Sequence, residues 1–317
     1  MTVDTTSRNG EPTAPELPAW LREMYPFRTR SLAVHGKRMS YVDEGAADAP
    51  PIVLLHGNPT WSFLYRNVVP RLTGRYRVIA PDHIGFGLSE KPSDPAYYTL
   101  ERHISNFTAL VESLGLKKVT LVLHDWGGPI GLGYAVAHPG NVARLVLMNT
   151  WAHLPHRPEA QELHWGLRLS RGPLGSFTVR RLNLFVELAL RTAVARRLSS
   201  REFDAYRFPF PDAASRTGVL AFPRMIPLRE SDPAGRAMSE IERGLQNITA
   251  PADILWGRQD PVFGRLHAYR LRDSLPNARE PVFLDQASHY LPEDAPDALV
   301  EKILTERKAA VALKILS

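Results

Sequence analysis

Short aliphatic runs recur along the chain, and turn residues separate them. The runs are rich in Val, Ile and Leu, a composition typical of strands buried in a parallel sheet. They lie at residues 51–55, 77–80, 119–124, 143–148, 253–256 and 279–284. Two shorter runs, 31–35 and 38–42, flank a turn at Gly36-Lys37 and predict a β-hairpin. The chain is therefore expected to build one sheet of mostly parallel strands.

Helical periodicity fills the segments between these runs. Apolar side chains at Ile104, Phe107 and Val111 fall on one face of a helix over residues 100–114. Residues 61–72 and 128–138 are further helical segments. Strands that alternate with helices predict an α/β fold with helices on both faces of the central sheet.

The alternation breaks between residues 155 and 227. This stretch holds helical segments, such as residues 174–198, and prolines at positions 209, 211 and 223, but no evident strand. Because strand-like runs resume afterwards, we expect a helical cap at 155–227, inserted into a core domain formed by 19–154 and 228–317. Residues 1–18 lack periodicity and are expected to be a flexible tail. Residues 308–317 are weakly amphipathic, which suits either a longer last helix or a contact within a homo-oligomer.

Composition and charge exclude several classes of protein. The 317 residues contain no cysteine, which rules out disulfides, thiolate catalysis and cysteine-bound metals. No run reaches the roughly 18 apolar residues of a membrane helix, and residues 1–13 lack the apolar centre of a secretion signal. We therefore expect a cytoplasmic protein with no membrane partner. The net charge of +6 comes from scattered basic residues, a pattern that does not indicate nucleic-acid binding.

The segment from Leu121 to Gly128 carries the first candidate for chemistry. A buried strand there runs directly into a helix, and two glycines follow the bend. This pattern is typical of the nucleophile elbow of an α/β-hydrolase fold, in which small residues let the backbone turn sharply and expose the central side chain. The central residue is Asp125, and a carboxylate can displace a leaving group from an sp3 carbon to form an alkyl ester. Leu123 departs from the small residue usual two places earlier, and Asp125 could instead simply cap the helix.

Two later loops supply partners for such a nucleophile. An elbow enzyme carries its acid and then its histidine on loops after later strands. Asp260 and His289 each lie just beyond a predicted strand end, where parallel sheets place ligands. Taken singly, Asp260 is also a common turn residue before proline and His289 a common surface residue, but their joint order with Asp125 favours a triad. Asp285 is a rival acid that ranks below Asp260, because it lies on the strand-end side of the histidine loop.

Asn58 and Trp126 are candidates for stabilising negative charge. Asn58 follows the first core strand, where this fold supplies an oxyanion-hole amide, and Trp126 follows Asp125. Their backbone N–H groups suit an oxyanion hole, and the Asn58 amide and the Trp126 indole suit a departing halide. Each residue also has an ordinary explanation, a turn before proline for Asn58 and packing for Trp126. As a pair beside Asp125, they favour function.

Three motifs together carry a family resemblance. They are residues 56–67 (HGNPTWSFLYRN), 81–89 (PDHIGFGLS) and 124–129 (HDWGGP). With them the chain resembles the haloalkane dehalogenases of the α/β-hydrolase superfamily, over nearly its whole length beyond the tail. The second motif is shared across many α/β-hydrolases, so we interpret it as a structural turn.

The resemblance implies a role for each candidate residue. Asp125 is implied to be the nucleophile, His289 the base, Asp260 the acid that orients the histidine, and Asn58 with Trp126 the halide ligands. Some relatives place a glutamate after the strand that precedes the cap, but Asn149-Thr150-Trp151 offers none. The chain therefore resembles the subgroup that combines a late aspartate with an asparagine and tryptophan halide pair.

The implied activity is hydrolysis of a small haloalkane to alcohol, halide and a proton. Displacement in a dry apolar pocket needs no metal or cofactor. We expect four residues to line that pocket, although each is also a common core residue type: Trp165, Phe177, Leu184 and Phe222.

Other functions on the same scaffold stay open. An epoxide hydrolase shares the aspartate nucleophile but uses two cap tyrosines. Residues 151–250 contain a single tyrosine, Tyr206. A luciferase of the coelenterazine type is a more distant alternative, because fold and triad alone do not fix a reaction. The intact set of Asp125, Asp260 and His289 argues against a catalytically idle binding protein.

Overall fold

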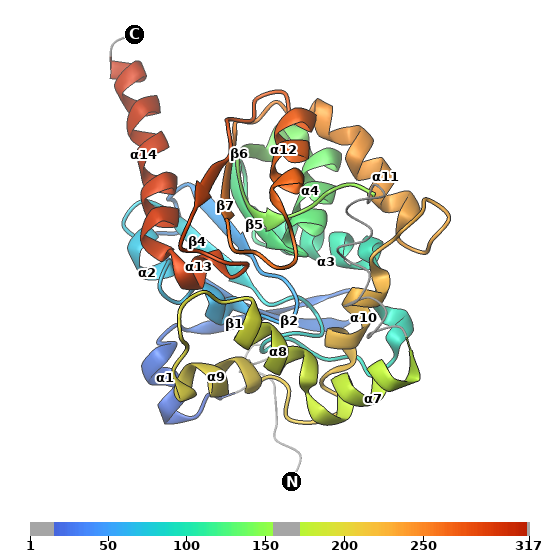
Figure 1. Ribbon diagram of the computed structural model, residues 1–317. Coiled ribbons are helices and arrows are strands. Elements are labelled where there is room, and N and C mark those ends of the chain that lie inside the picture. The colour runs from blue at the N-terminus through green and yellow to red at the C-terminus, as the bar shows by residue number, and fades with distance from the viewer. Residues whose placement is uncertain (1–15, 155–171, 316–317) are drawn as a thin grey trace.

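The sheet is the centre of the molecule, and its strands lie where the aliphatic runs predict them. The computed structural model describes residues 16–154 and 172–315 (Figure 1). Eight strands follow the order β1-β2-β4-β3-β5-β6-β7-β8. They are β1 (Thr29–Val34), β2 (Lys37–Glu44), β3 (Pro51–Leu55), β4 (Arg77–Pro81), β5 (Val119–Asp125), β6 (Val142–Thr150), β7 (Ala252–Gly257) and β8 (Val282–Leu284). Only the pairs that involve β2 are antiparallel, which confirms a mostly parallel sheet.

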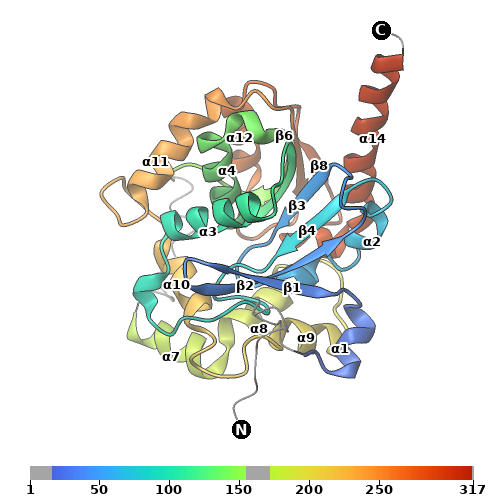
Figure 2. The same ribbon diagram turned by 180° about the vertical axis from the view of Figure 1, so that it is seen from behind.

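Helices cover both faces of the sheet and shield its aliphatic strands from water. One face carries α3 (Leu100–Ser113), α4 (Gly127–Ala137), α11 (Gly235–Gly244) and α12 (Arg265–Ser274), and the other carries α2 (Val69–Leu72) and α14 (Pro296–Ile315) (Figures 1 and 2). Every residue of β5 is buried as a result. The shorter elements are α1 (Ala19–Met24), α13 (Leu291–Asp294), η1 (Ser62–Tyr65), η2 (Pro95–Tyr97), η3 (Pro139–Asn141) and η4 (Leu245–Asn247).

Four helices between β6 and β7 gather at one end of the molecule (Figure 1). They are α7 (Pro173–Leu182), α8 (Leu184–Thr192), α9 (Ser200–Arg207) and α10 (Thr217–Met225). We refer to them as the cap helices. In residues 172–227 the chain forms no strand, as the sequence pattern predicts. The single helix expected over 174–198 is wrong, because Asn183 adopts a left-handed conformation with φ of 54° between α7 and α8.

Two further boundaries differ from the sequence pattern, and proline accounts for both. The helix expected over 61–72 is instead the 3-10 turn η1 followed by the short α2, which begins anew around Pro70. The strand expected over 279–284 is shortened to β8, because Pro281 has no N–H to donate to its neighbour. None of the helices in residues 16–154 and 172–315 combines the length and apolar character needed to cross a membrane.

Candidate active site

Asp125 lies at the sharp bend between β5 and α4. Its φ of 50° is left-handed, a conformation that L residues rarely adopt, and α4 begins two residues later. A Cβ atom on Gly127 would overlap the carbonyl of Leu55, and one on Gly128 would overlap the side chain of Thr150. The bend therefore requires both glycines. The position before the helix is occupied by Trp126, and no side chain caps α4 there, so capping does not explain Asp125.

The departure at Leu123 has a structural compensation. A Cβ atom on Gly131, one turn into α4, would overlap the side chain of Leu123. The space that a small residue on the strand would leave is thus provided by a glycine on the helix. Close packing of strand and helix at the elbow is preserved with the two residue sizes exchanged.

The two carboxylate oxygens of Asp125 have different surroundings. Oδ1 accepts a hydrogen bond from the backbone N–H of Asn58 at 2.6 Å. Oδ2 lies 3.8 Å from Nε2 of His289, beyond hydrogen-bond distance. Burial raises the pKa of Asp125 to about 6, against the opposing effects of His289 and of the Trp126 and Asn58 N–H groups. One oxygen is held by the backbone, and the other faces the histidine.

Asp260 holds the opposite edge of His289. Nδ1 of His289 lies 3.0 Å from Oδ2 of Asp260. Burial lowers the pKa of His289, but the charge and hydrogen bond of Asp260 and the charge of Asp125 outweigh it, so the pKa is raised overall. Burial raises the pKa of Asp260. The interactions with His289, Asn149 and Val262 outweigh burial, so the pKa lies below its usual value. The histidine is oriented with Nε2 toward Asp125.

Asn58 and Trp126 are both buried beside this triad. The Asn58 side-chain Nδ2 donates to the carbonyl of Val219 on α10 at 3.3 Å, while Oδ1 has no partner among the described residues. The Trp126 ring meets Trp151 edge-on at 4.9 Å and Phe222 at 5.0 Å between ring centroids. Both side chains therefore lie at the junction of the sheet with the cap helices.

Comparisons with known proteins show which family the chain resembles. The model of the α/β hydrolase fold family matches residues 50–296. A cis-3-alkyl-4-alkyloxetan-2-one decarboxylase of Shewanella oneidensis is 40% identical over 89% of this chain and 89% of its own. A haloalkane dehalogenase of Mycolicibacterium paratuberculosis is 36% identical over 90% of this chain and 95% of its own. The crystal structure of haloalkane dehalogenase DbeA from Bradyrhizobium elkani superposes with a TM-score of 0.81, at 29% identity, covering 90% of this chain and 99% of that one.

The chain belongs to the α/β-hydrolase superfamily and is a relative of the haloalkane dehalogenases.

The expected pocket residues of this α/β-hydrolase differ in burial. Phe222 is buried against Trp126, whereas Phe177 is 56% exposed and Leu184 37% exposed. The expectation that Phe177 and Leu184 form walls of an enclosed pocket is therefore wrong, because these side chains lie on the outer surface of α7 and α8. Trp165 lies outside the described residues.

Two aromatic residues that the sequence analysis did not single out complete the surroundings of this α/β-hydrolase's triad. The ring of Phe263, just after Asp260, stacks on Trp151 at 5.0 Å and lies 5.6 Å from His289. An aromatic layer thus links the histidine to Trp126. Its signal in the sequence is the position of each ring within three residues of a strand end or of Asp125, Asp260 or His289.

Asn149 is a functional residue that sequence reasoning missed. In the sequence it stands out only as a position that lacks an acid, yet its Nδ2 donates to Oδ2 of Asp260 at 2.7 Å and its Oδ1 accepts from the Gly257 N–H at 3.0 Å. It therefore fixes the Asp260 carboxylate beside His289. Its signal was its place at the carboxyl end of β6, the edge of the sheet that supplies the other site residues.

The remaining candidates have structural roles in this α/β-hydrolase. Asp285 pairs with the exposed Arg258 at 2.5 Å rather than with His289. Asp82 accepts the N–H groups of Ser62 and Leu88, both at 2.8 Å, and so fixes the loop that follows Asn58. Within the described ranges, no three His, Asp or Glu side chains converge in a way that could hold a metal ion.

Proposed function

We propose that this α/β-hydrolase removes halide from haloalkanes through an alkyl ester on Asp125. The observation that carries the proposal is the unequal environment of its carboxylate, with Oδ1 held by the Asn58 N–H at 2.6 Å and Oδ2 facing Nε2 of His289 at 3.8 Å. An oxygen already engaged by a backbone amide is a poor nucleophile. Oδ2 is therefore the attacking atom.

In the first step Oδ2 forms a bond to the substrate carbon, and the carbon–halogen bond breaks with its electron pair leaving on the halide. The Trp126 indole and the Asn58 amide are the donors for that anion. The Asn58 amide has two N–H groups, so one can bind the halide while the other keeps its 3.3 Å hydrogen bond to Val219. No proton moves in this step.

In the second step His289 takes a proton from water through Nε2, and the water oxygen attacks Cγ of Asp125. Oδ1 becomes the oxyanion, and it already accepts the Asn58 N–H at 2.6 Å. Collapse breaks the bond between Cγ and Oδ2, the alcohol takes the proton from His289, and Asp125 is regenerated as its carboxylic acid, which loses its proton to solvent. Asp260 stabilises the imidazolium throughout.

A second activity is favoured by the 40% identity to an oxetan-2-one decarboxylase. In a four-membered lactone the ring oxygen is bonded to an sp3 carbon, so Oδ2 of Asp125 could open the ring there and release a carboxylate in place of halide. Loss of carbon dioxide from that carboxylate, with departure of the Asp125 carboxylate, gives an alkene. This route consumes no water and needs no general base.

The experiment compares both substrates with the native protein and with His289→Phe. For dehalogenation, native protein releases bromide from 1-bromobutane continuously, whereas His289→Phe releases one equivalent and retains a butyl group on the peptide that carries Asp125, detected by mass spectrometry. For decarboxylation, a cis-3,4-dialkyloxetan-2-one yields alkene with both proteins. Alkene without bromide release would replace the first proposal with the second. Turnover of an epoxide alone would contradict both and favour the epoxide hydrolase alternative.

A further inference from the structure

The loop that carries His289 is tied to the cap on both sides of the histidine. The N–H of Ser288 donates to Oδ2 of Asp294 at 2.9 Å, and the N–H of Tyr290 donates to the carbonyl of Ala193 at 3.0 Å. Ala193 directly follows the cap helix α8. Both chain neighbours of His289 are thus held, Tyr290 directly by the cap segment and Ser288 by Asp294 of α13.

Asp294 bridges the two segments with one carboxylate. Besides Ser288, it accepts the N–H groups of Ala195 and Arg196, each at 3.0 Å. Residues 193–196 therefore meet the histidine loop through a backbone carbonyl and through a carboxylate that collects three N–H groups. A carboxylate accepts such bonds strongly, so it fixes the spacing between the segments.

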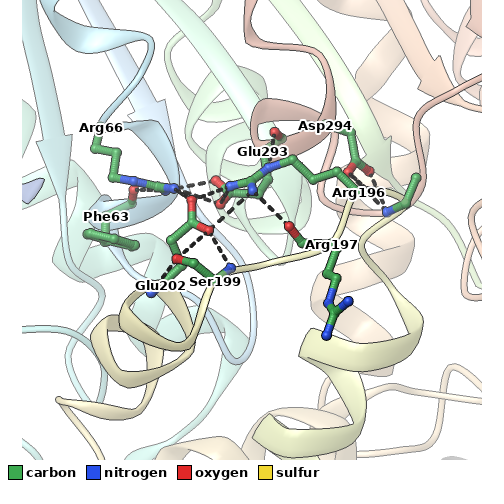
Figure 3. Close-up of polar contacts among 9 residues, drawn as sticks. Phe63, Arg66, Arg196, Arg197, Ser199, Glu202, Glu293 and Asp294 are labelled. Carbon is green, nitrogen blue, oxygen red and sulfur yellow. Dashed lines mark hydrogen bonds and ion pairs between the residues drawn. The ribbon is translucent and has the colours of Figure 1, made fainter.

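A partly buried ionic cluster reinforces this junction (Figure 3). It consists of Arg66, Arg196, Glu202 and Glu293. Arg66 binds Glu293 in a bidentate manner at 2.7 and 2.8 Å and reaches Glu202 at 2.8 Å. Arg196 reaches Glu202 and Glu293, both at 2.5 Å. The four charges cancel, and the Glu293 carboxylate has no solvent exposure.

The cluster joins three parts of the site. Arg66 follows η1 in the same loop region as Asn58, Arg196 and Glu202 come from the cap, and Glu293 lies in α13, which directly follows His289-Tyr290. Glu202 also accepts the N–H of Ser199 at 2.7 Å at the start of α9, which fixes its carboxylate within the cap. A shift of the cap loop would therefore disturb the histidine loop.

We propose that Asp294 and Arg196 are positioning residues that set His289 against the ester on Asp125 by fixing the cap loop 193–196. The inference rests on the proposed function, in which His289 acts only in the second step. Loosening this junction should therefore slow hydrolysis of the ester and leave its formation unchanged. A purely structural role would slow both steps or neither.

The test uses Asp294→Asn and Arg196→Met, each with a matched control. Asp232→Asn removes a carboxylate that likewise accepts two backbone N–H groups, from Leu228 at 2.7 Å and Arg229 at 3.0 Å. Arg197→Met removes the neighbouring guanidinium, which points away from the cluster and meets no carboxylate in the described part of the chain (Figure 3). Thermal unfolding establishes that each variant is folded.

Rapid quenching with 1-bromobutane followed by mass spectrometry measures both steps. We expect Asp294→Asn to hydrolyse the ester at least about tenfold more slowly, since small misplacements of a catalytic group have large effects on rate. Arg196→Met should change in the same direction by a smaller factor, the alkyl form should accumulate in both, and the controls should behave as native. Equal slowing of both steps, no slowing, or the same effect in Asp232→Asn would overturn the proposal.

A second readout needs no substrate. The proton on Nδ1 of His289, hydrogen-bonded to Asp260, should give a downfield NMR resonance in native protein and in the controls, and this resonance should broaden or vanish in Asp294→Asn. If native protein releases no bromide and forms no adduct, the proposed function fails, and the NMR result alone decides whether the junction positions His289. A sharp, unchanged resonance in Asp294→Asn would then refute the positioning role.

Discussion

Asn149 donates from Nδ2 to Oδ2 of Asp260 at 2.7 Å, so the carboxylate that meets His289 is itself held by an amide from the neighbouring strand β6. Asn149 has a φ of 42°, a left-handed conformation that asparagine, aspartate and glycine tolerate best. This limits the informative replacements to Asp and Gly. Other residues would add backbone strain to the loss of the amide.

Asn149→Asp should raise the pKa of His289 further, because it places a second carboxylate beside Asp260. A histidine that holds its proton more tightly is a free base only at higher pH. The acid limb of the pH profile of kcat, measured by halide release, should therefore shift to higher pH by about one unit. Asn149→Gly keeps the backbone conformation and removes the whole amide without adding a carboxylate, so it should lower kcat without that upward displacement. An unchanged profile in Asn149→Asp would mean that Asn149 does not act on the triad.

The ionisation of Asp125 should limit activity on the acid side. Burial raises its pKa to about 6, and only the carboxylate form is nucleophilic. We expect kcat/KM for a bromoalkane to fall below about pH 6 in the native protein. A plateau that continues to pH 4.5 would contradict this assignment.

The same pKa predicts how stability depends on pH. Because the pKa of Asp125 is raised from 3.8 in the unfolded chain to about 6 in the fold, the folded state binds the proton more tightly between these values. The cost of keeping the carboxylate charged is fully present above pH 6 and absent below about pH 4. Asp125→Asn should thus be more stable than native protein at pH 7, by up to about 3 kcal/mol. Denaturant unfolding at pH 7 and pH 4.5 should show that advantage shrinking as the pH falls.

Gly57 lies where any side chain would meet the nucleophile. A Cβ atom there would overlap the carboxylate of Asp125. Gly57→Ala should displace that group from the Asn58 amide and lower activity at least about 100-fold. Gly74→Ala is the matched control, because a Cβ atom on Gly74 meets nothing within 4 Å and should leave activity unchanged.

Trp126→Phe keeps the aromatic ring and removes the indole N–H. Loss of one donor to a developing anion should slow alkylation by about 100-fold and affect ester hydrolysis less. Trp151→Phe makes the same change in the ring that meets Trp126 at 4.9 Å, and it should alter alkylation much less. Stopped-flow measurement of halide release distinguishes the two. Equal effects would indicate that packing, rather than the N–H group, matters.

The fold and the triad could be read from the sequence because both depend on local patterns. Aliphatic runs are diagnostic of buried strands, and the carboxyl ends of parallel strands meet at one edge, so Asp125, Asp260 and His289 were expected together. The sequence does not predict the role of Asn149, because that role depends on a hydrogen bond to Asp260, 111 positions later in the chain. The exposed Phe177 shows the complementary limit, because helical periodicity does not reveal which face of a cap helix meets the core.

The pairing of charged residues cannot be predicted from the sequence for a different reason. Arg196 and Glu293 resemble ordinary surface residues in sequence, yet the two are 97 positions apart and meet in the ionic cluster. Nothing local distinguishes them from arginines and glutamates that only face solvent. Their pairing depends on the path of the cap, which the strand and helix pattern leaves open.

Helix α4 begins two residues after Asp125 and is buried from Gly127 to Ala135. Its amino end carries partial positive charge, and little water surrounds it to weaken that field. Dissolved ions therefore screen only weakly the attraction that both the carboxylate and the outgoing anion experience at this buried end. Turnover should stay nearly constant between low and high concentrations of sodium sulfate, in contrast to enzymes that steer their substrates with surface charge.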